Sequence, residues 1–353
     1  AMAIIPALLY FTGIFITVHL EAKKLDLKGI PRDQLPRISY LVKNSYLILP
    51  LVLLVWLVST GARTMAYSAA ISILGAFIVG VVNFFITEVR SREEGETVGQ
   101  VFKKVLNIAI IMAFESLQAG ARSCVSVAVA CAMAGMIAGC ITVTGLASTL
   151  INFIVNFAGD ATMLGLVLTM LTCIILGMGV PTTANYCIMA ATTAPILIQL
   201  GIPVVAAHFF VFYFGIVADI TPPVALAAYA GSAIAHSDPM KTGLNAAKLA
   251  IAAFIVPYIL AFNPVMVLQG SFTAIDLGIV IITSIVGLYG VAVALNGTVF
   301  TKVNPLFRIA FAAGGLCMMI PEPVSDIVGV GLVVGLSVVQ YLLAKKRKAA
   351  AAA

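Results

Sequence analysis

Five oxygen-bearing side chains lie inside otherwise apolar sequence and could together bind an alkali cation. They are Thr182, Thr183 and Asn185 in the first group, and Asp219 and Thr221 about 30 residues later. Hydroxyl, amide and carboxylate oxygens, with main-chain carbonyls of unwound helix, are the ligands that coupling cations use in membrane proteins. The chemistry is therefore ion coordination, for which the main chain must also be interrupted.

Helix-breaking residues accompany both groups. Gly177, Gly179 and Pro181 precede the first, because glycine permits unusual backbone angles and proline disfavours helix at the residue before it. Pro222 and Pro223 follow the second and leave two carbonyls without helical donors. Within hydrocarbon, such backbone persists only where protein or a water-filled cavity surrounds it.

We therefore predict a re-entrant hairpin tip or broken helix at 177–185 and an unwound helix at 218–224. A tight loop outside the membrane is the alternative for the first break, and a helix cap or a water-facing acid is the alternative for Asp219. The predicted cation ligands are Gly177, Gly179, Thr182, Thr183, Asn185, Asp219 and Thr221. The start of the returning helix, near Thr183, would also suit a carboxylate.

Other residues offer less chemistry. His208 is interpreted as a packed or hydrogen-bonded helix residue, with a proton carrier as the alternative. Tyr186 and Tyr229 are interpreted as either site-lining or packing residues. The six cysteines, in apolar helical sequence, are interpreted as small core residues. The sequence contains no catalytic motif and no transition-metal ligand spacing, which argues against an enzyme.

Composition places these elements in a membrane. Of 353 residues, 62% are hydrophobic and 10% charged, and the mean hydropathy is +1.13, whereas soluble domains carry about a quarter charged residues. The Lys and Arg that give the net charge of +6 lie in short segments between apolar runs, so they indicate topology rather than a nucleic-acid partner. We expect an all-α polytopic membrane protein in contact with lipid.

The chain divides by hydropathy into spans and connectors. We expect a span at 1–20, a cytoplasmic amphipathic connector at 21–45 by the positive-inside rule, and two scaffold spans at 46–87. A connector and an interfacial helix follow at 88–122. The region 123–264 holds the two breaks, 265–344 holds further spans, and 345–353 is a basic tail. No signal peptide is expected at the N-terminus.

Several ordered segments resemble the fused, TAXI-type permease of TRAP transporters. They are Gly120-Ala121-Arg122, 141–146, 176–186, and 207–215 leading into 219–229, with weaker similarity at 6–24 and 238–264. The resemblance implies an elevator-type, ion-transporter-like fold in a bacterial or archaeal inner membrane. It implies sodium-driven import of small organic anions, often dicarboxylates, delivered by a periplasmic binding protein.

Carried over by position, 123–264 would be the second transport repeat, and its two breaks would form one sodium site and one wall of the substrate cavity. The substrate contacts on that wall would be Thr183, Asn185, Tyr186, Pro222 and Pro223. A proton is the alternative coupling ion, and no other cofactor is expected. A non-transporting scaffold or assembly subunit is the alternative function.

The first repeat of the family has its own hairpin and Pro-Pro break, and nothing before Met65 matches either. We therefore expect this sequence to correspond to the C-terminal half of such a permease. The N-terminal half would lie on the same or a separate chain, and the span at 1–20 would link to it.

Overall fold

The structure is a computed structural model that describes residues 2–31, 35, 37–61, 64–90, 98–159, 161–180, 182–270, 272–320 and 322–352. These residues form helices and turns, and their only isolated extended pairing joins Thr298 and Lys302. The predicted all-α class is confirmed. Some residues of the predicted connectors and of the first break lie outside the described part of the chain. They are the charged residues Arg32, Arg92, Glu93, Glu94 and Glu96, and the helix-breaking Pro181.

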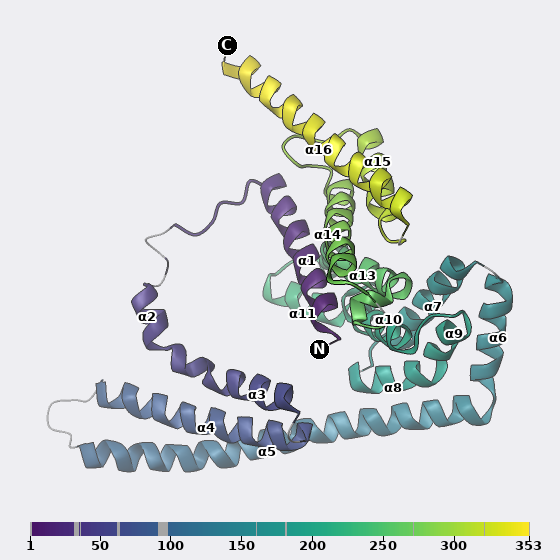
Figure 1. Cartoon of the computed structure of the whole chain (residues 1–353). Helices are drawn as coiled ribbons and strands as arrows, with labels where there is room; N and C mark the ends of the chain where they lie inside the picture. Colours follow the sequence, from purple (N-terminus) through teal and green to yellow (C-terminus); the bar gives the residue numbers. More distant parts are fainter. Residues whose placement is uncertain are drawn as a thin grey trace. The chain divides into compact units, whose positions relative to one another are not determined.

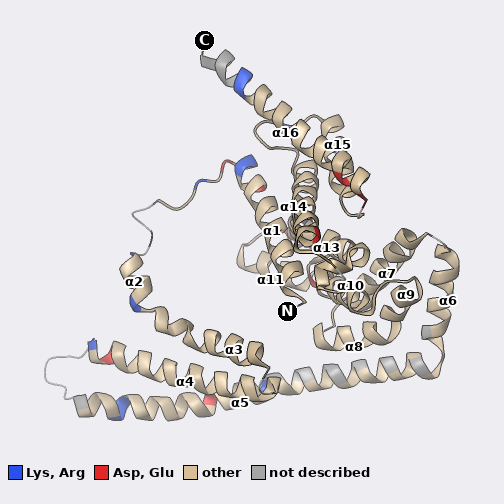
Figure 2. Cartoon of the chain, viewed as in Figure 1, with Lys and Arg blue, Asp and Glu red and all other residues tan. Residues whose placement is uncertain are grey.

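Six of the described helical segments are long and apolar enough to cross a membrane. They are Ile4–Lys24, Met65–Arg90, Gly99–Arg122, Pro239–Phe262, Ala274–Asn296 and Pro323–Lys346. Charged side chains gather mostly near helix ends and connectors, with long uncharged stretches between them (Figure 2). This arrangement defines the chain as a polytopic membrane protein.

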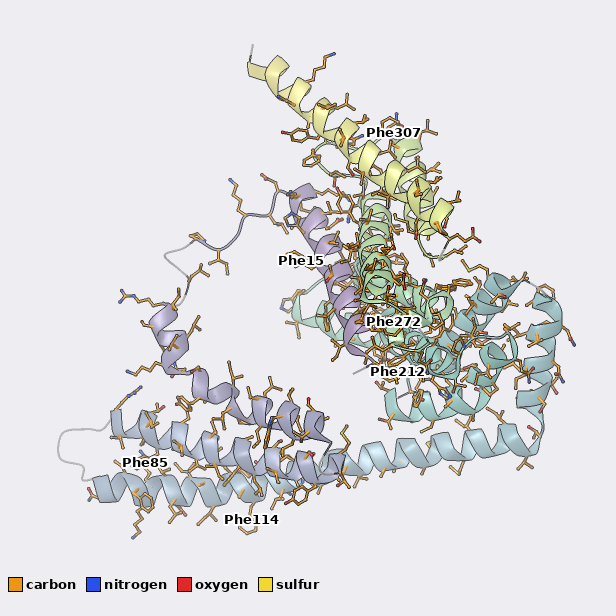
Figure 3. All side chains as sticks on the ribbon, viewed as in Figure 1. Phe15, Phe85, Phe114, Phe212, Phe272 and Phe307 are labelled. Atoms are coloured by element: carbon orange, nitrogen blue, oxygen red, sulfur yellow. The ribbon has the colours of Figure 1, made fainter. Side chains whose placement is uncertain are left out.

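The chain forms two compact units, of which the smaller covers Lys28–Val127. It contains α2 (Ile38–Lys43), η2 (Ser45–Ile48), α3 (Leu49–Thr60), α4 (Met65–Arg90) and the first part of α5 (Val98–Val143). The Tyr46 hydroxyl donates to Asn83 Oδ1 at 2.6 Å. Lys104 pairs with Glu88, which ties α5 to α4. Phe114 projects from α5 with 71% of its surface exposed, as expected of a lipid-facing residue (Figure 3).

Helix α5 runs unbroken for 46 residues, so the boundary expected between 122 and 123 falls inside it. The local reason is that the sequence around Arg122 contains no proline, and a single Gly120 costs a helix only about 1 kcal/mol. The interfacial helix expected within 88–122 and the first part of the region 123–264 thus belong to one helix.

The larger unit covers Ala1–Leu27 and Ala128–Ala353. It contains the rest of α5 and the following elements: α1 (Ile4–Lys24), α6 (Leu146–Ala158), α7 (Thr162–Gly177), α8 (Thr182–Thr192), α9 (Ala194–Gln199), α10 (Val204–Val217), η3 (Ala218–Ile220), α11 (Leu226–Ile234), α12 (Pro239–Leu249), α13 (Ile251–Phe262), η4 (Pro264–Val267), α14 (Ala274–Asn296), α15 (Pro305–Cys317) and α16 (Pro323–Ala352).

Helix α10 lies at the centre of the core of this unit. It packs against α7, α8, α9 and α13 (Figure 1). Its Phe210 and Phe214 side chains are fully buried. Helix α1 packs on α13 and α14, and α14 packs on α15 and α16. Since α10 ends at the second break and contacts the helices on both sides of the first, the core itself positions the candidate site.

Candidate functional site

The first break separates two helices that are each too short to span a bilayer. Helix α7 has 16 residues and ends at Gly177, and α8 has 11 and begins at Thr182, whereas a span needs about 20. Gly179 has a φ of +74°, in the left-handed region that favours glycine. Cys173 Sγ in α7 donates to Thr193 Oγ1, after α8, at 3.3 Å. The predicted interruption of helix is confirmed.

The second break unwinds the chain in two steps. Helix α10 tightens into the 3₁₀ turn η3 after Val217, and Thr221 is extended, with a ψ of 124°. The Thr221 hydroxyl donates to the Val217 carbonyl at 2.7 Å and so satisfies one carbonyl at the helix end. The prolines at 222 and 223 carry no N–H, and regular helix resumes only at Leu226.

The two breaks meet at Gly177 and Ala218. A Cβ atom added to Gly177 would lie 2.9 Å from the Ala218 Cβ and 2.8 Å from Asn185 Nδ2. Gly177 therefore serves close packing and not an unusual backbone angle, since it lies in regular helix at the end of α7. Together the ends of α7 and α10 bring the carbonyl-rich segments of both breaks side by side.

Asn185 joins the two breaks by a buried hydrogen bond. Its side chain is 1% exposed, and Nδ2 donates to the Gly215 carbonyl oxygen at 3.0 Å. Its Oδ1 atom is buried and has no hydrogen-bond partner among the described residues. An unpaired buried amide oxygen is costly, so it marks a position where a cation or a water would be stabilised.

The other predicted ligands are more accessible. Thr182 and Thr183 are exposed, and Asp219 and Thr221 are half-buried. Pro222 is half-buried against Gly243, and Pro223 is exposed. The structure thus brings Gly177 and Asn185 against the second break, and places the first-group hydroxyls at the accessible start of α8.

The two tyrosines after the breaks are both hydrogen-bonded. The Tyr186 hydroxyl lies 2.9 Å from His208 Nδ1, which confirms the interpretation of His208 as a hydrogen-bonded helix residue. The Tyr229 hydroxyl donates to the Pro223 carbonyl at 2.7 Å and so braces the unwound segment. Tyr186 also contacts Phe212 edge to face, with ring centroids 5.7 Å apart.

Two residues of this contact region, Gly215 and Ala218, are absent from the predicted ligand set. The signal for Gly215 was present, because a small residue after the bulky run 209–214 indicates close helix approach. Nothing local indicated Ala218. The core interpretation of the cysteines holds for Cys173, which is buried, but is wrong for Cys124, Cys140 and Cys187, which are exposed.

Among the residues that the structure describes, no group of three or more His, Cys, Asp or Glu side chains could hold a metal ion. The oxygen atoms at the two breaks are instead amide, hydroxyl and main-chain groups, with Asp219 as the acid of the unwound segment. Such a set suits a weakly held monovalent cation rather than a transition metal.

Interrupted helices packed together inside a polytopic helical protein are typical of secondary transporters. The family described as "Tripartite ATP-independent periplasmic transporter, DctM component" matches residues 1–275. The chain belongs to this family and is a membrane permease component of a TRAP transporter. No curated protein and no solved structure gave a significant match. The family is one of transport permeases and not of enzymes.

Proposed function

We propose that this permease imports small organic anions of the dicarboxylate class, coupled to sodium, by an elevator movement of the region that holds the two breaks. A periplasmic substrate-binding protein would deliver the anion, as in the TAXI-type transporters that the sequence resembles. The first-repeat elements, on this polypeptide or another, would complete the substrate cavity. The bacterial or archaeal inner membrane is the proposed location.

The observation that carries this proposal is the buried junction of the two breaks. A side chain at Gly177 would place its Cβ atom within 3 Å of Ala218 and Asn185, so only glycine fits there. Asn185 Oδ1 has no hydrogen-bond partner among the described residues. A sodium ion at this junction would supply the missing partner and neutralise the converging carbonyl dipoles. Thr183 and Thr221 would contribute hydroxyl oxygens, and Asp219 the negative charge.

The anion would bind beside the cation. The N-terminus of α8, at Thr182, presents main-chain N–H groups that suit a carboxylate. Thr183, Asn185, Tyr186, Pro222 and Pro223 would form the wall. Because the sodium ion would lie between this wall and the carbonyls, each ligand would strengthen binding of the other, which is the basis of coupled transport.

Sodium binding can be tested without knowing the substrate. The purified full chain in detergent is melted in sodium chloride and in choline chloride at equal ionic strength. Sodium that binds only the folded state stabilises it and so raises Tm. At a sodium concentration of about 100 times the dissociation constant, the free energy of unfolding increases by about 2.7 kcal/mol. Thr183→Ala and Thr221→Ala should reduce this sodium-dependent rise, whereas Thr242→Ala, outside the breaks, should retain it.

Transport of radiolabelled succinate is then measured in proteoliposomes that contain the chain together with the first-repeat elements, with and without the binding protein. Uptake that requires a sodium gradient supports the proposal. Uptake driven equally by a proton gradient alone would replace sodium with the proton. Absence of uptake together with an unchanged Tm in sodium would favour the scaffold alternative.

A further inference from the structure

A basic groove of about 500 Å³ lies in the larger unit, where α1 and α14 end and α15 begins. Its walls carry four cationic side chains, Lys23, Lys24, Lys302 and Arg308. Arg308 donates from Nε to the Ala294 carbonyl at 2.7 Å and from an Nη atom to the Leu295 carbonyl at 3.2 Å, so it also caps α14. Lys24 pairs with Glu21 at 3.4 Å. The groove keeps a net positive charge.

Two buried polar atoms in this groove lack protein partners. Asn296 is 4% exposed, and its Nδ2 donates to the Thr17 carbonyl at 3.3 Å. Its Oδ1 atom and the Thr298 hydroxyl have no hydrogen-bond partner among the described residues, and both residues line the groove. A ligand with an anionic oxygen and a hydroxyl group would satisfy both.

An apolar groove of about 480 Å³ adjoins the basic one. Phe300 lines both. The apolar groove runs over α1, α14 and α16, with lining residues that include Ile16, Val286, Val334 and Val338. Because these three helices are of membrane-spanning length, this groove lies along the hydrocarbon region.

The basic groove lies at a membrane interface. It is at the end of two spanning segments, Ile4–Lys24 and Ala274–Asn296. The Phe300 and Tyr341 rings contact each other 5.5 Å apart beside it, and such aromatic residues concentrate at the headgroup level. Lys345 and Lys346 follow on α16 four and five residues after Tyr341, so the positive-inside rule places this end in the cytoplasm.

We propose that the paired grooves bind one anionic phospholipid from the cytoplasmic leaflet. Its phosphate lies among Lys23, Lys302 and Arg308, and a headgroup hydroxyl meets Asn296 Oδ1. One acyl chain occupies the apolar groove beyond Phe300. The lipid thereby joins α1, α14 and α16, since each contributes to at least one of the two grooves.

The test is native mass spectrometry of the detergent-purified full chain titrated with dioleoyl-phosphatidylglycerol or dioleoyl-phosphatidylcholine. Phosphatidylglycerol should bind more tightly. Lys23→Gln with Lys302→Gln should weaken it about twenty-five-fold, from about fivefold for each cation. The matched control, Lys345→Gln with Lys346→Gln, removes the same charge outside the groove and should leave the affinity within about twofold. Circular dichroism melting checks that each variant is folded.

Two further measurements distinguish the binding of a whole phospholipid from the binding of a free anion in the basic groove. Val334→Trp, and Val338→Trp as a second variant at a similarly exposed position, should fill the apolar groove and weaken phosphatidylglycerol binding. Inorganic phosphate at millimolar concentration should not displace the lipid. If both pairs of lysine substitutions weaken phosphatidylglycerol binding equally, the effect is one of general surface charge and not of the groove. Unaltered affinity in both tryptophan variants, or displacement by phosphate, would assign the groove to a free anion. Each of these results overturns the proposal.

Discussion

Asn185 Nδ2 donates a hydrogen bond of 3.0 Å to the main-chain carbonyl of Gly215, 30 residues away. The bond joins the helix after the first break to the helix before the second. A Cβ atom on Gly215 would lie 3.1 Å from the same Nδ2 atom, so the close approach of α8 to α10 requires glycine at this position. The two interruptions are thereby fastened to each other and form one structural feature.

Replacing Asn185 should therefore destabilise the larger unit. Asn185→Ala leaves the buried Gly215 carbonyl without its side-chain donor, at a cost of about 1–3 kcal/mol. The measurement is unfolding of the purified chain by sodium dodecyl sulfate titration in mixed micelles. Asn245→Ala, at an exposed position on α12, is the control and should change stability by less than about 0.5 kcal/mol. Equal stability of the two variants would contradict a role for the hydrogen bond.

The two glycines of the first break should respond to alanine for different reasons. Gly177→Ala places a methyl group 2.8–2.9 Å from Asn185 and Ala218, so we expect an overpacking cost of about 1–3 kcal/mol. Gly179→Ala meets no atom within 4 Å but keeps a φ of +74°, which costs about 1–2 kcal/mol. The sodium-dependent rise in Tm should fall in Gly177→Ala, because the junction must open.

Gly231→Ala is the matched control for both glycine variants. Gly231 lies in α11 with nothing within 4 Å of the added methyl group, so alanine there should stabilise the helix by about 0.5–1 kcal/mol. A loss of stability in Gly231→Ala comparable with that in Gly177→Ala would show that the detergent-purified chain tolerates no glycine change, and would contradict a steric clash as the cause in Gly177→Ala.

Tyr186 and His208 should be energetically coupled. Their hydroxyl and Nδ1 atoms lie 2.9 Å apart, and the residues belong to different helices. In a double-mutant cycle with Tyr186→Phe and His208→Ala, we expect a coupling energy of unfolding of about 0.5–1.5 kcal/mol. Additive effects of the two substitutions would indicate that the hydrogen bond contributes nothing.

Glu21 and Lys248 connect the end of α1 to α12. Their Oε2 and Nζ atoms are 3.1 Å apart, and the side chains are 24% and 27% exposed. Lys248→Met should cost about 0.5–1 kcal/mol, in the range of partly exposed ion pairs. The charge swap Glu21→Lys with Lys248→Glu should recover most of that loss, whereas Glu21→Lys alone should cost more than Lys248→Met. A swap that restores nothing would assign the effect to packing of the lysine stem.

The sequence by itself determined the class of the protein and the places where its helices are interrupted. Apolar segments of spanning length must form helices because lipid offers no hydrogen bonds to the backbone. Pro222 and Pro223 lack N–H groups wherever they are placed, so the second break follows from local chemistry. Both breaks could therefore be predicted from a few residues each.

Only the tertiary structure decided which atoms meet. Thr182 and Asn185 have equivalent local signals, yet the first is exposed and the second is 1% exposed. The difference arises because Asn185 faces α10, and the direction of a helix face depends on packing against residues 30 positions away. The contact of Gly177 with Ala218 has the same origin. Composition and helix breakers are local properties, whereas the junction between the breaks is a property of the packed core.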